Sequence, residues 1–297
     1  MRVLVTGGSG FVGGHVVARL REEGHEVVVA DLKPFPGGDV ETVVGDLRDK
    51  SVVEAALQPG TDAVVHLAAL TSVLQSVNEP EAVYDTNVAA TSMLLERCRE
   101  LGVGRFVLAS TNAVVGDVGF AAIDEQIVLR PLTPYGATKA AGEMLLSAYG
   151  ACYAMQCVAL RFTNIYGAGM QVKDSVVARL MRAAMAGGGI QIYGDGEQVR
   201  DYLYVTDAVA AIVLGLSLGH SDTLTIGAGV SVSMNELHRL CCEATGVEIG
   251  AEHIEGKAGE MPAVIVSLTH ATELGFTPAY TVLEGLKATW ADFTAAG

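Results

Sequence analysis

The feature that most constrains the fold is a repeated alternation of short β-branched runs with helix-length segments between Met1 and about Phe162. Strand-like runs occur at residues 3–6, 26–31, 42–46, 63–68, 105–110 and 157–162. Such alternation is typical of βαβ units and a parallel sheet. Continuous apolar runs such as Val27-Val28-Val29 favour strands that are covered on both faces. The sequence therefore predicts an α/β fold with a doubly wound parallel sheet.

The pattern changes after Phe162 and predicts a second, smaller α/β part at the C-terminal side. A helix is expected over 175–186, strands over 190–193 and 202–205, and an apolar helix up to about 218. Ser233, with Glu236 three residues later, has the spacing of a capping box at the start of another helix. We expect a first domain over 1–165 with a return segment at about 202–227, and a second over 166–201 and 228–297.

Charge and cysteine content exclude several classes of protein. The 297 residues contain 19 Lys and Arg against 34 Asp and Glu, so the net charge is 19 − 34 = −15, which disfavours nucleic acid as a partner. The longest apolar stretch, at 208–219, is shorter than the ~18 residues of a membrane span. The five cysteines show no C-x-x-C pair, and the start of the chain has no signal-peptide pattern. We expect a cytoplasmic protein with no structural metal.

A glycine-rich run, Gly7-Gly8-Ser9-Gly10-Phe11-Val12-Gly13, directly follows the first strand-like run and opens a helix. Glycines in this setting permit a tight turn, let the backbone approach a pyrophosphate, and allow close packing of helix against sheet. The positive end of the helix dipole favours the phosphate charge. The run predicts a Rossmann dinucleotide site, with cofactor contacts from Gly7, Gly10, Phe11, Val12 and Gly13.

Two aspartates follow the next two strand-like runs. Asp31 ends the second run, 18 residues after Gly13, where a carboxylate accepts the ribose hydroxyls and repels a 2′-phosphate. The cofactor is therefore predicted to be NAD rather than NADP. Asp46, with Leu47 beside it, follows the third run and is expected near the adenine, although a turn-forming aspartate has the same pattern.

The pair Tyr135 and Lys139 predicts acid–base chemistry. Four residues apart on a helix, a phenol and an ammonium share one face. The cation is expected to lower the pKa of the tyrosine from about 10 towards neutrality. Ser110 and Thr111 end the fifth strand-like run, at the sheet edge where a cofactor and its substrate meet.

These motifs, in their order along the chain, give a family resemblance. The chain resembles the extended short-chain dehydrogenase/reductases, and among them the NAD-dependent nucleotide-sugar epimerases and dehydratases such as UDP-glucose 4-epimerase. The resemblance rests on the segments at 6–13, 66–69, 87–88, 110–116, 135–139, 161–167 and 194–202. It covers the chain almost from end to end.

The resemblance implies a role for each matching residue. Thr111 would hydrogen-bond the sugar hydroxyl that is oxidised, Tyr135 would take its proton, and Lys139 would bind the nicotinamide ribose. Further NAD contacts are implied for Leu67, Ala68, Ala69 and Asn87. Contacts to a nucleotide-sugar substrate, which we expect to be UDP-linked, are implied for Asn112, Asn164, Arg200, Tyr202, Lys257, Glu260 and Val264.

Departures from the family pattern narrow the reaction. In the 4,6-dehydratases an Asp and a Glu follow the matching threonine, whereas this chain has Asn112 and Ala113. Epimerisation at C4 needs neither carboxylate, so the resemblance favours a nucleotide-sugar 4-epimerase acting on a UDP-hexose or its N-acetylated or uronate analogue. A nucleotide-sugar reductase, an atypical dehydratase and a non-catalytic NAD-sensing regulator remain as alternatives.

Three further expectations depend on single positions or stripes. Val264 matches a gate residue of the family, where a small side chain admits N-acetylated sugars, although it could equally continue a strand. The apolar stripe from Met93 to Leu95 lies on a helix that in this family often packs in a homodimer, although core packing would look the same. His66 is expected to be a packed residue because the pattern gives it no catalytic partner.

Overall fold

The computed structural model describes residues 1–256 and 261–295. The chain forms two compact units: unit 1 comprises Met1–Asp117, Glu125–Arg161 and Val209–Leu224, and unit 2 comprises Val118–Asp124, Phe162–Ala208 and the rest of the described chain from Thr225. This division differs from the predicted boundaries in four short segments, 118–124, 162–165, 202–208 and 225–227, all of which lie in unit 2. Residues 118–124 and 202–208 lie in unit 2, because both contain strands that pair within that unit.

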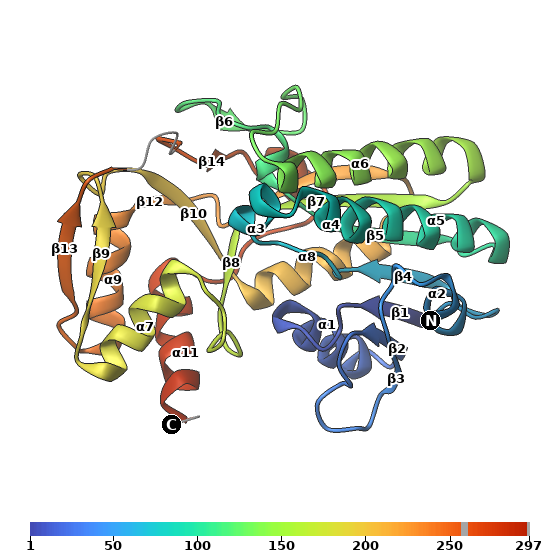
Figure 1. Ribbon diagram of the computed structural model, residues 1–297, viewed down its shortest axis with the longest axis horizontal. Coiled ribbons are helices and arrows are strands. Elements are labelled where there is room, and N and C mark those ends of the chain that lie inside the picture. The colour runs from blue at the N-terminus through green and yellow to red at the C-terminus, as the bar shows by residue number, and fades with distance from the viewer. Residues whose placement is uncertain (257–260, 296–297) are drawn as a thin grey trace. The chain divides into compact units, whose positions relative to one another are not determined.

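A seven-stranded sheet forms the centre of unit 1, with the order β11-β7-β5-β4-β1-β2-β3 (Figure 1). The strands are β1 Arg2–Thr6, β2 Glu26–Asp31, β3 Glu41–Val44, β4 Ala63–His66, β5 Arg105–Thr111, β7 Gln156–Phe162 and β11 Asp222–Ile226. The five strands from β3 to β5 pair in parallel. The strand order reverses between β1 and β4, the point at which ligands bind in open α/β sheets. The predicted doubly wound fold is confirmed.

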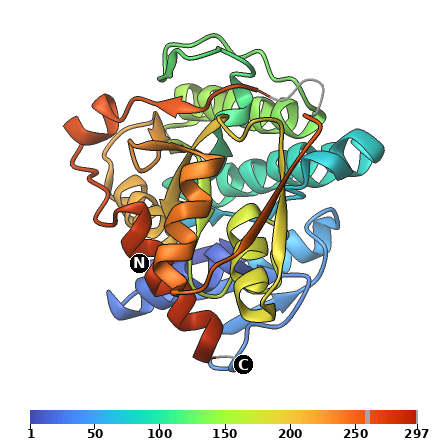
Figure 2. The ribbon, with the colours of Figure 1, turned by 90° about the vertical axis from the view of Figure 1, so that its left-hand side faces the viewer.

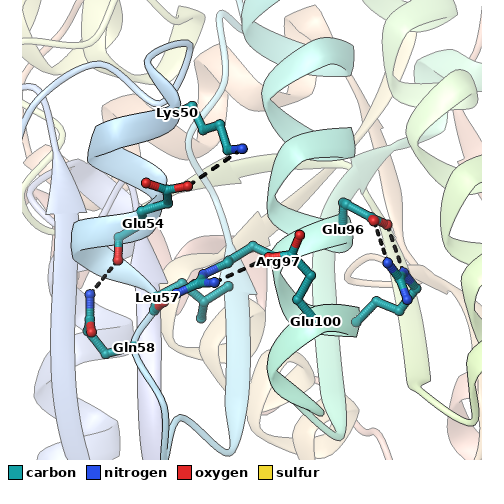
Figure 3. Close-up of polar contacts among 8 residues, drawn as sticks. Lys50, Glu54, Leu57, Gln58, Glu96, Arg97 and Glu100 are labelled. Atoms are coloured by element: carbon teal, nitrogen blue, oxygen red, sulfur yellow. Dashed lines mark hydrogen bonds and ion pairs between the residues drawn. The ribbon is translucent and has the colours of Figure 1, made fainter.

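Helices cover both faces of this sheet, with α5 and α6 on one face and α1 on the other (Figure 1). Their bounds are α1 Phe11–Glu22, α2 Lys50–Ala56, α3 Val73–Asn78, α4 Pro80–Tyr84, the π-helix η1 Asp85–Ala89, α5 Ala90–Leu101, the 3₁₀ turn η2 Asn112–Val114 and α6 Pro134–Tyr153. Figure 3 shows how α5 is tied to the end of α2: Arg97 donates to the carbonyl of Leu57 at 3.3 Å and pairs with Glu100.

The core of unit 1 lies between the sheet and the helices α5 and α6. Leu94, Leu95 and Cys98 of α5 are fully buried in it beside Phe106 and Leu108 of β5. The apolar stripe of this helix, which the sequence analysis connected with a homodimer, therefore packs within one subunit. The stripe is buried because the sheet presents a large apolar surface to this face of the helix.

Unit 2 contains three small sheets and four helices of its own in the described part of the chain. The strands are β6 Ala122–Ile123, β8 Asn164–Tyr166, β9 Gly189–Tyr193, β10 Val199–Tyr204, β12 Ser231–Ser233, β13 Gly250–Ile254 and β14 Ile265–Val266. They pair as β12-β10-β8, β13-β9 and β14-β6. Figure 2 shows β9 and β13 side by side, near α7 Val176–Ala186 and α9 Met234–Thr245. The remaining helices are α10 Thr269–Glu273 and α11 Val282–Ala295.

Helix ends follow the predicted capping chemistry at most positions. Ser233 accepts from the N–H of Glu236 at 3.1 Å, which confirms the capping side chain of α9. Asp207 lies in the first turn of the helix α8 Val205–Ser217 and accepts from the N–H groups of Ala279 and Tyr280. Across residues 1–256 and 261–295, the helices are too short or too polar to cross a membrane.

Candidate functional site

The glycine turn after β1 has no room for a side chain at Gly7 or at Gly13. Gly7 has φ +71°, and a Cβ there would lie 2.8 Å from the backbone nitrogen of Ala68. A Cβ on Gly13 would lie 2.1 Å from the carbonyl oxygen of Gly7. Gly10 is the N-cap of α1 and offers no capping side chain. The turn therefore exposes backbone N–H groups at a helix N-terminus, which is the geometry that binds a pyrophosphate.

Asp31 lies at the carboxyl end of β2 and close to this turn. Its carboxylate accepts from the backbone N–H of Ser9 at 3.0 Å and from that of Lys33 at 3.2 Å. Asp46 is held differently, because Arg48 donates to both of its oxygens at 2.6–3.0 Å, and this keeps the pKa of Asp46 below its usual range. Phe11 and Val12, in the first turn of α1, are half-buried, and Leu47 is buried.

The loop after β4 is fixed by residues from three elements. The N–H of Ala68 donates to the Thr6 hydroxyl at 3.2 Å. Asn87 accepts from the N–H of Leu70 at 2.9 Å and donates to the Leu70 carbonyl and to Thr138 at 3.0 and 3.1 Å. Both amide hydrogens of Asn87 are therefore used, so Asn87 holds the 67–70 loop in place.

His66 is a packed residue, in agreement with the sequence-based expectation. It is 1% exposed, and its ring nitrogens lie 2.6 Å from the Thr6 hydroxyl and 2.9 Å from the Thr91 hydroxyl. Burial, together with the nearby charge of Lys139, lowers the pKa of His66 to about 3. The ring is neutral at physiological pH.

Thr111 and Tyr135 meet where β5 ends and α6 begins. Thr133 caps α6 and Pro134 occupies its first position, which places Tyr135 in the first turn. A side-chain hydrogen bond joins Tyr135 to Thr111, and it favours the ionised phenol. Burial acts in the opposite direction and raises the pKa of Tyr135 to about 12. The expectation of a pKa near neutrality is therefore wrong for this structure, because desolvation of the phenolate outweighs the interactions that stabilise it.

Lys139 lies one helical turn after Tyr135 and is buried, with 4% of its surface exposed. Its ammonium donates to the carbonyl of Ala109 on β5 at 2.8 Å. Burial lowers the pKa of Lys139 to about 8, while the carboxylate of Glu143 acts to raise it. An ammonium with hydrogens left to donate is therefore held at the carboxyl end of β5.

Behind Lys139 lies a buried ion pair that the sequence analysis did not assign. Arg161 on β7 donates to both oxygens of Glu143 at 2.8–3.1 Å, and the Ser110 hydroxyl donates to the same carboxylate. All three residues are at most 4% exposed. A signal was present, because Glu143 continues the four-residue spacing of Tyr135 and Lys139 along α6.

Unit 2 has a pocket of about 900 Å³ at the start of β8 and β10 and along α7. Asn164, Arg200 and Tyr202, three of the predicted substrate-binding residues, all line it. The structure therefore brings these three together, as expected. Arg179 and Arg182 of α7 also line the pocket and were missed, because on a helix they resemble ordinary solvent-exposed residues.

The remaining predicted substrate residues are less clearly placed. Lys257 and Glu260 lie outside the described residues. Val264 is 3% exposed, donates its N–H to Val199 at 3.0 Å, and is not among the described residues that line the pocket. Asn112 begins η2 and lies directly after Thr111, whose hydroxyl accepts from the N–H of Ala113 at 3.2 Å.

The residues present in unit 1 fit a dinucleotide. The glycine turn leaves room only for backbone beside a phosphate group, and Asp31 places a carboxylate at the end of β2. Ala69 lies in the loop held by Asn87, and Lys139 keeps donors for a ribose. In the part of the chain that the structure describes, no cluster of metal-binding side chains occurs.

Comparison with known proteins leads to the same assignment. A sequence model of the NAD dependent epimerase/dehydratase family matches residues 3–227. UDP-glucose 4-epimerase of Corynebacterium glutamicum is 32% identical over 100% of this chain and 97% of its own. dTDP-glucose 4,6-dehydratase of Streptomyces niveus is 32% identical over 97% of this chain and 91% of its own. The structure of UDP-glucose 4-epimerase from Thermotoga maritima with UDP-glucose superposes with a TM-score of 0.94 and 33% identity, over 100% of this chain and 99% of that one.

These matches agree with the glycine turn, with Asp31 and with the tyrosine–lysine pair, and they confirm the resemblance found in the sequence. The family model covers more than two thirds of the chain, and the relatives cover nearly all of it. The chain belongs to the NAD dependent epimerase/dehydratase family.

Proposed function

We propose that this chain is a NAD-dependent nucleotide-sugar 4-epimerase. The observation that carries the proposal is the group formed by Thr111, Tyr135 and Lys139 at the end of β5, with no carboxylate directly after Thr111. Asn112 and Ala113 occupy the two positions where the dehydratases have an acid and a base. The group can move a proton to and from a sugar hydroxyl, but it lacks the carboxyl groups that eliminate water.

Each residue of the group has one task in the proposed reaction. The chemistry that bound NAD would supply is a hydride acceptor for C4 of the sugar and, in its reduced form, a hydride donor to the opposite face of the resulting 4-keto sugar. Tyr135 takes the proton of the C4 hydroxyl and gives it back, while Thr111 orients that hydroxyl. Lys139 holds a positive charge in a buried site, which stabilises the phenolate and binds a ribose of the cofactor. The net reaction consumes no NAD.

The pocket of unit 2 supports a nucleotide diphosphate as the rest of the substrate. Arg200 can bind phosphate oxygens through two parallel hydrogen bonds, and Arg182 adds positive charge along α7, whereas Arg179 is paired with Asp174 of the same pocket. Tyr202 and Asn164 contribute an aromatic surface and an amide. The Thermotoga maritima relative was solved with UDP-glucose. We infer that the substrate is UDP-linked, that unit 1 binds NAD, and that unit 2 binds the nucleotide.

A dehydratase is the strongest alternative, because dTDP-glucose 4,6-dehydratase is as similar in sequence as the epimerase. The test is a panel of UDP- and dTDP-hexoses incubated with the protein and NAD, with products followed by ¹H NMR and NADH by absorbance. The proposal expects the C4 epimer, without lasting NADH. A 4-keto-6-deoxy product would identify a dehydratase, steady NADH consumption in a parallel incubation supplied with NADH would identify a reductase, and no product at all would favour an NAD-sensing regulator.

We also propose a cytoplasmic homodimer. The buried thiols of Cys98, Cys157 and Cys241 suit a reducing compartment. Met144 on α6 has an exposed apolar side chain, which a second subunit could cover. Light scattering should give twice the monomer mass, and Met144→Glu should shift the protein towards monomer. A monomeric wild type would contradict this assembly.

A further inference from the structure

The ion pair between Glu143 and Arg161 is buried in unit 1 and has no part in the reaction proposed above. Its side chains are 2% and 5% exposed, so both charges have lost most of their hydration. Burying an ion pair of this kind brings little net stability, because desolvation offsets most of the attraction. Its position offers another explanation: Glu143 lies four residues after Lys139 and eight after Tyr135 on the same face of α6.

Glu143 is close enough to Lys139 to act on its pKa. A carboxylate paired directly with that ammonium would cancel its positive charge. In the structure, Arg161 and Ser110 occupy the carboxylate instead, with three hydrogen bonds from the guanidinium and one from the hydroxyl. The Lys139 ammonium donates to the Ala109 carbonyl, which is neutral. Arg161 therefore takes the place of Lys139 as the ion-pair partner of Glu143.

The three buried charges sum to +1, since Lys139 and Arg161 are cations and Glu143 is an anion. We propose that Arg161 is a positioning residue for the epimerase reaction: by holding Glu143, it leaves the charge of Lys139 available to stabilise the Tyr135 phenolate. The inference rests on the proposed function for the use of that phenolate. The inference predicts that the ionisation of Tyr135 depends on the charges behind Lys139. This dependence can be measured whichever sugar reacts.

The other elements packed against α6 contribute little to this balance. His66 on β4 is neutral, because burial lowers its pKa to about 3. Among the described residues, α4 and η1 bring Glu81 and Asp85, neither of which is among the causes that shift the pKa of Lys139. The charged residues of α5 pair with one another, as Glu96 does with Arg99 and Arg97 with Glu100 (Figure 3).

Charge changes in the pair should move the pKa of Tyr135 in opposite directions. Eight helical residues span about 12 Å, and a unit charge at that distance in the protein interior shifts a pKa by about one unit. Arg161→Gln lowers the cluster charge to zero and should raise the pKa by about one unit. Glu143→Gln raises it to +2 and should lower the pKa by about one unit. The double variant restores +1 and should return the pKa to the wild-type value.

The experiment labels tyrosine at ¹³Cζ and follows the Tyr135 resonance of the NAD-saturated protein by NMR from pH 7 to 12. A pKa of about 12 leaves Tyr135 about half ionised at the upper end, so the ionised fraction there reports shifts in both directions. The resonance is assigned by its loss in Tyr135→Phe. Arg161→Lys is the matched control, because it keeps the charge and should leave the pKa close to wild type. The readout needs no substrate and no turnover, so a failure of the proposed epimerase activity would leave it intact.

Loss of one partner from a buried ion pair can unfold a protein. Ser110→Ala is therefore a second, milder variant that keeps both members of the pair. It removes one donor from Glu143 without leaving a buried charge unpaired, and should raise the Tyr135 pKa by a few tenths of a unit. Opposite shifts in the two single variants, with recovery in the double, support the proposal. Shifts of the same sign, an unchanged pKa in Ser110→Ala, or a Tyr135 signal in Glu143→Gln that stays mainly phenolic at pH 12 would overturn it.

Discussion

Two tyrosines of α6 differ in environment although they belong to the same helix. Tyr135 is joined by a side-chain hydrogen bond to Thr111, and its pKa is raised to about 12 by burial. Tyr149 is half-buried and donates to the carboxylate of Glu96 at 3.1 Å. Only Tyr135 lies one helical turn before the buried ammonium of Lys139. At the scale of single residues, the chemistry is therefore concentrated at Tyr135.

Tyr135→Phe is expected to reduce turnover by at least about 1,000-fold, because it deletes the proton acceptor of the chemical step. NAD affinity should change little, since the phenol contributes to chemistry more than to cofactor binding. Tyr149→Phe is the matched control and should keep wild-type turnover. Steady-state kinetics and NAD titration check both. Near-normal activity of Tyr135→Phe on the true substrate would remove it from the catalytic group.

The substrate-size prediction concerns Val264. If it is the gate, UDP-N-acetylglucosamine should be turned over beside UDP-glucose, and Val264→Tyr should remove the N-acetylated activity selectively. The valine is 3% exposed, so the added ring also has to displace neighbours. Val266→Tyr, two residues further along, controls for that packing effect. Equal loss of both substrates in Val264→Tyr would reject the gate.

His66 should make stability depend on pH. Its folded pKa of about 3 lies below the value of 6.5 in an unfolded chain. Above pH 6.5 the ring is neutral in both states, and below it only the unfolded chain binds the proton. Stability is therefore lost as the pH falls, by about 2 kcal/mol between pH 6.5 and pH 5. Urea denaturation of wild type and His66→Gln at pH 7 and 5 measures this, and an equal loss in both would contradict it.

At the scale of elements, helix ends show where the chain is strained. The helices α5, α7 and α9 end at glycines in the left-handed conformation, whereas α6 ends at Ala154 with φ +53°. Alanine is disfavoured there because its Cβ approaches the carbonyl oxygen that follows. Ala154 is exposed, so nothing else requires a side chain at this position.

Ala154→Gly is expected to stabilise the protein by up to about 1 kcal/mol, because relief of strain exceeds the entropy cost of glycine. The matched change is Gly102→Ala at the end of α5, where φ is +71° and a Cβ would meet open space. It should destabilise by about 1 kcal/mol through backbone strain alone. Thermal unfolding of both variants measures whether each change raises or lowers stability. A less stable Ala154→Gly would contradict the reasoning.

The elements were predictable to different degrees. The strands of the large sheet were recognisable because β-branched runs alternate with helices, and the run over 26–31 matches β2 in full. The pairing of β6 with β14 was not predictable, since each has two residues and they lie far apart in sequence. The contact of Arg161 with Glu143 was not predictable for the same reason, because a salt bridge between a helix and a strand leaves no local pattern in the sequence.

At the scale of the whole molecule, two units divide the residues that the proposed function needs. Unit 1 holds the glycine turn, Asp31 and the Thr111–Tyr135–Lys139 group, and unit 2 holds the pocket with Arg200. The central claim is that a sugar is oxidised at C4 and then reduced at the same carbon. Family membership alone leaves this open, because the dehydratases begin with the same oxidation.

The most direct test follows the hydrogen at C4. A UDP-hexose deuterated at that carbon is incubated with the protein and NAD, and the product is examined by ¹H NMR and mass spectrometry. An epimerase returns the hydride that it removed, so the account predicts the C4 epimer with its deuterium still at C4. Deuterium found at C6, or lost to the solvent, would contradict it.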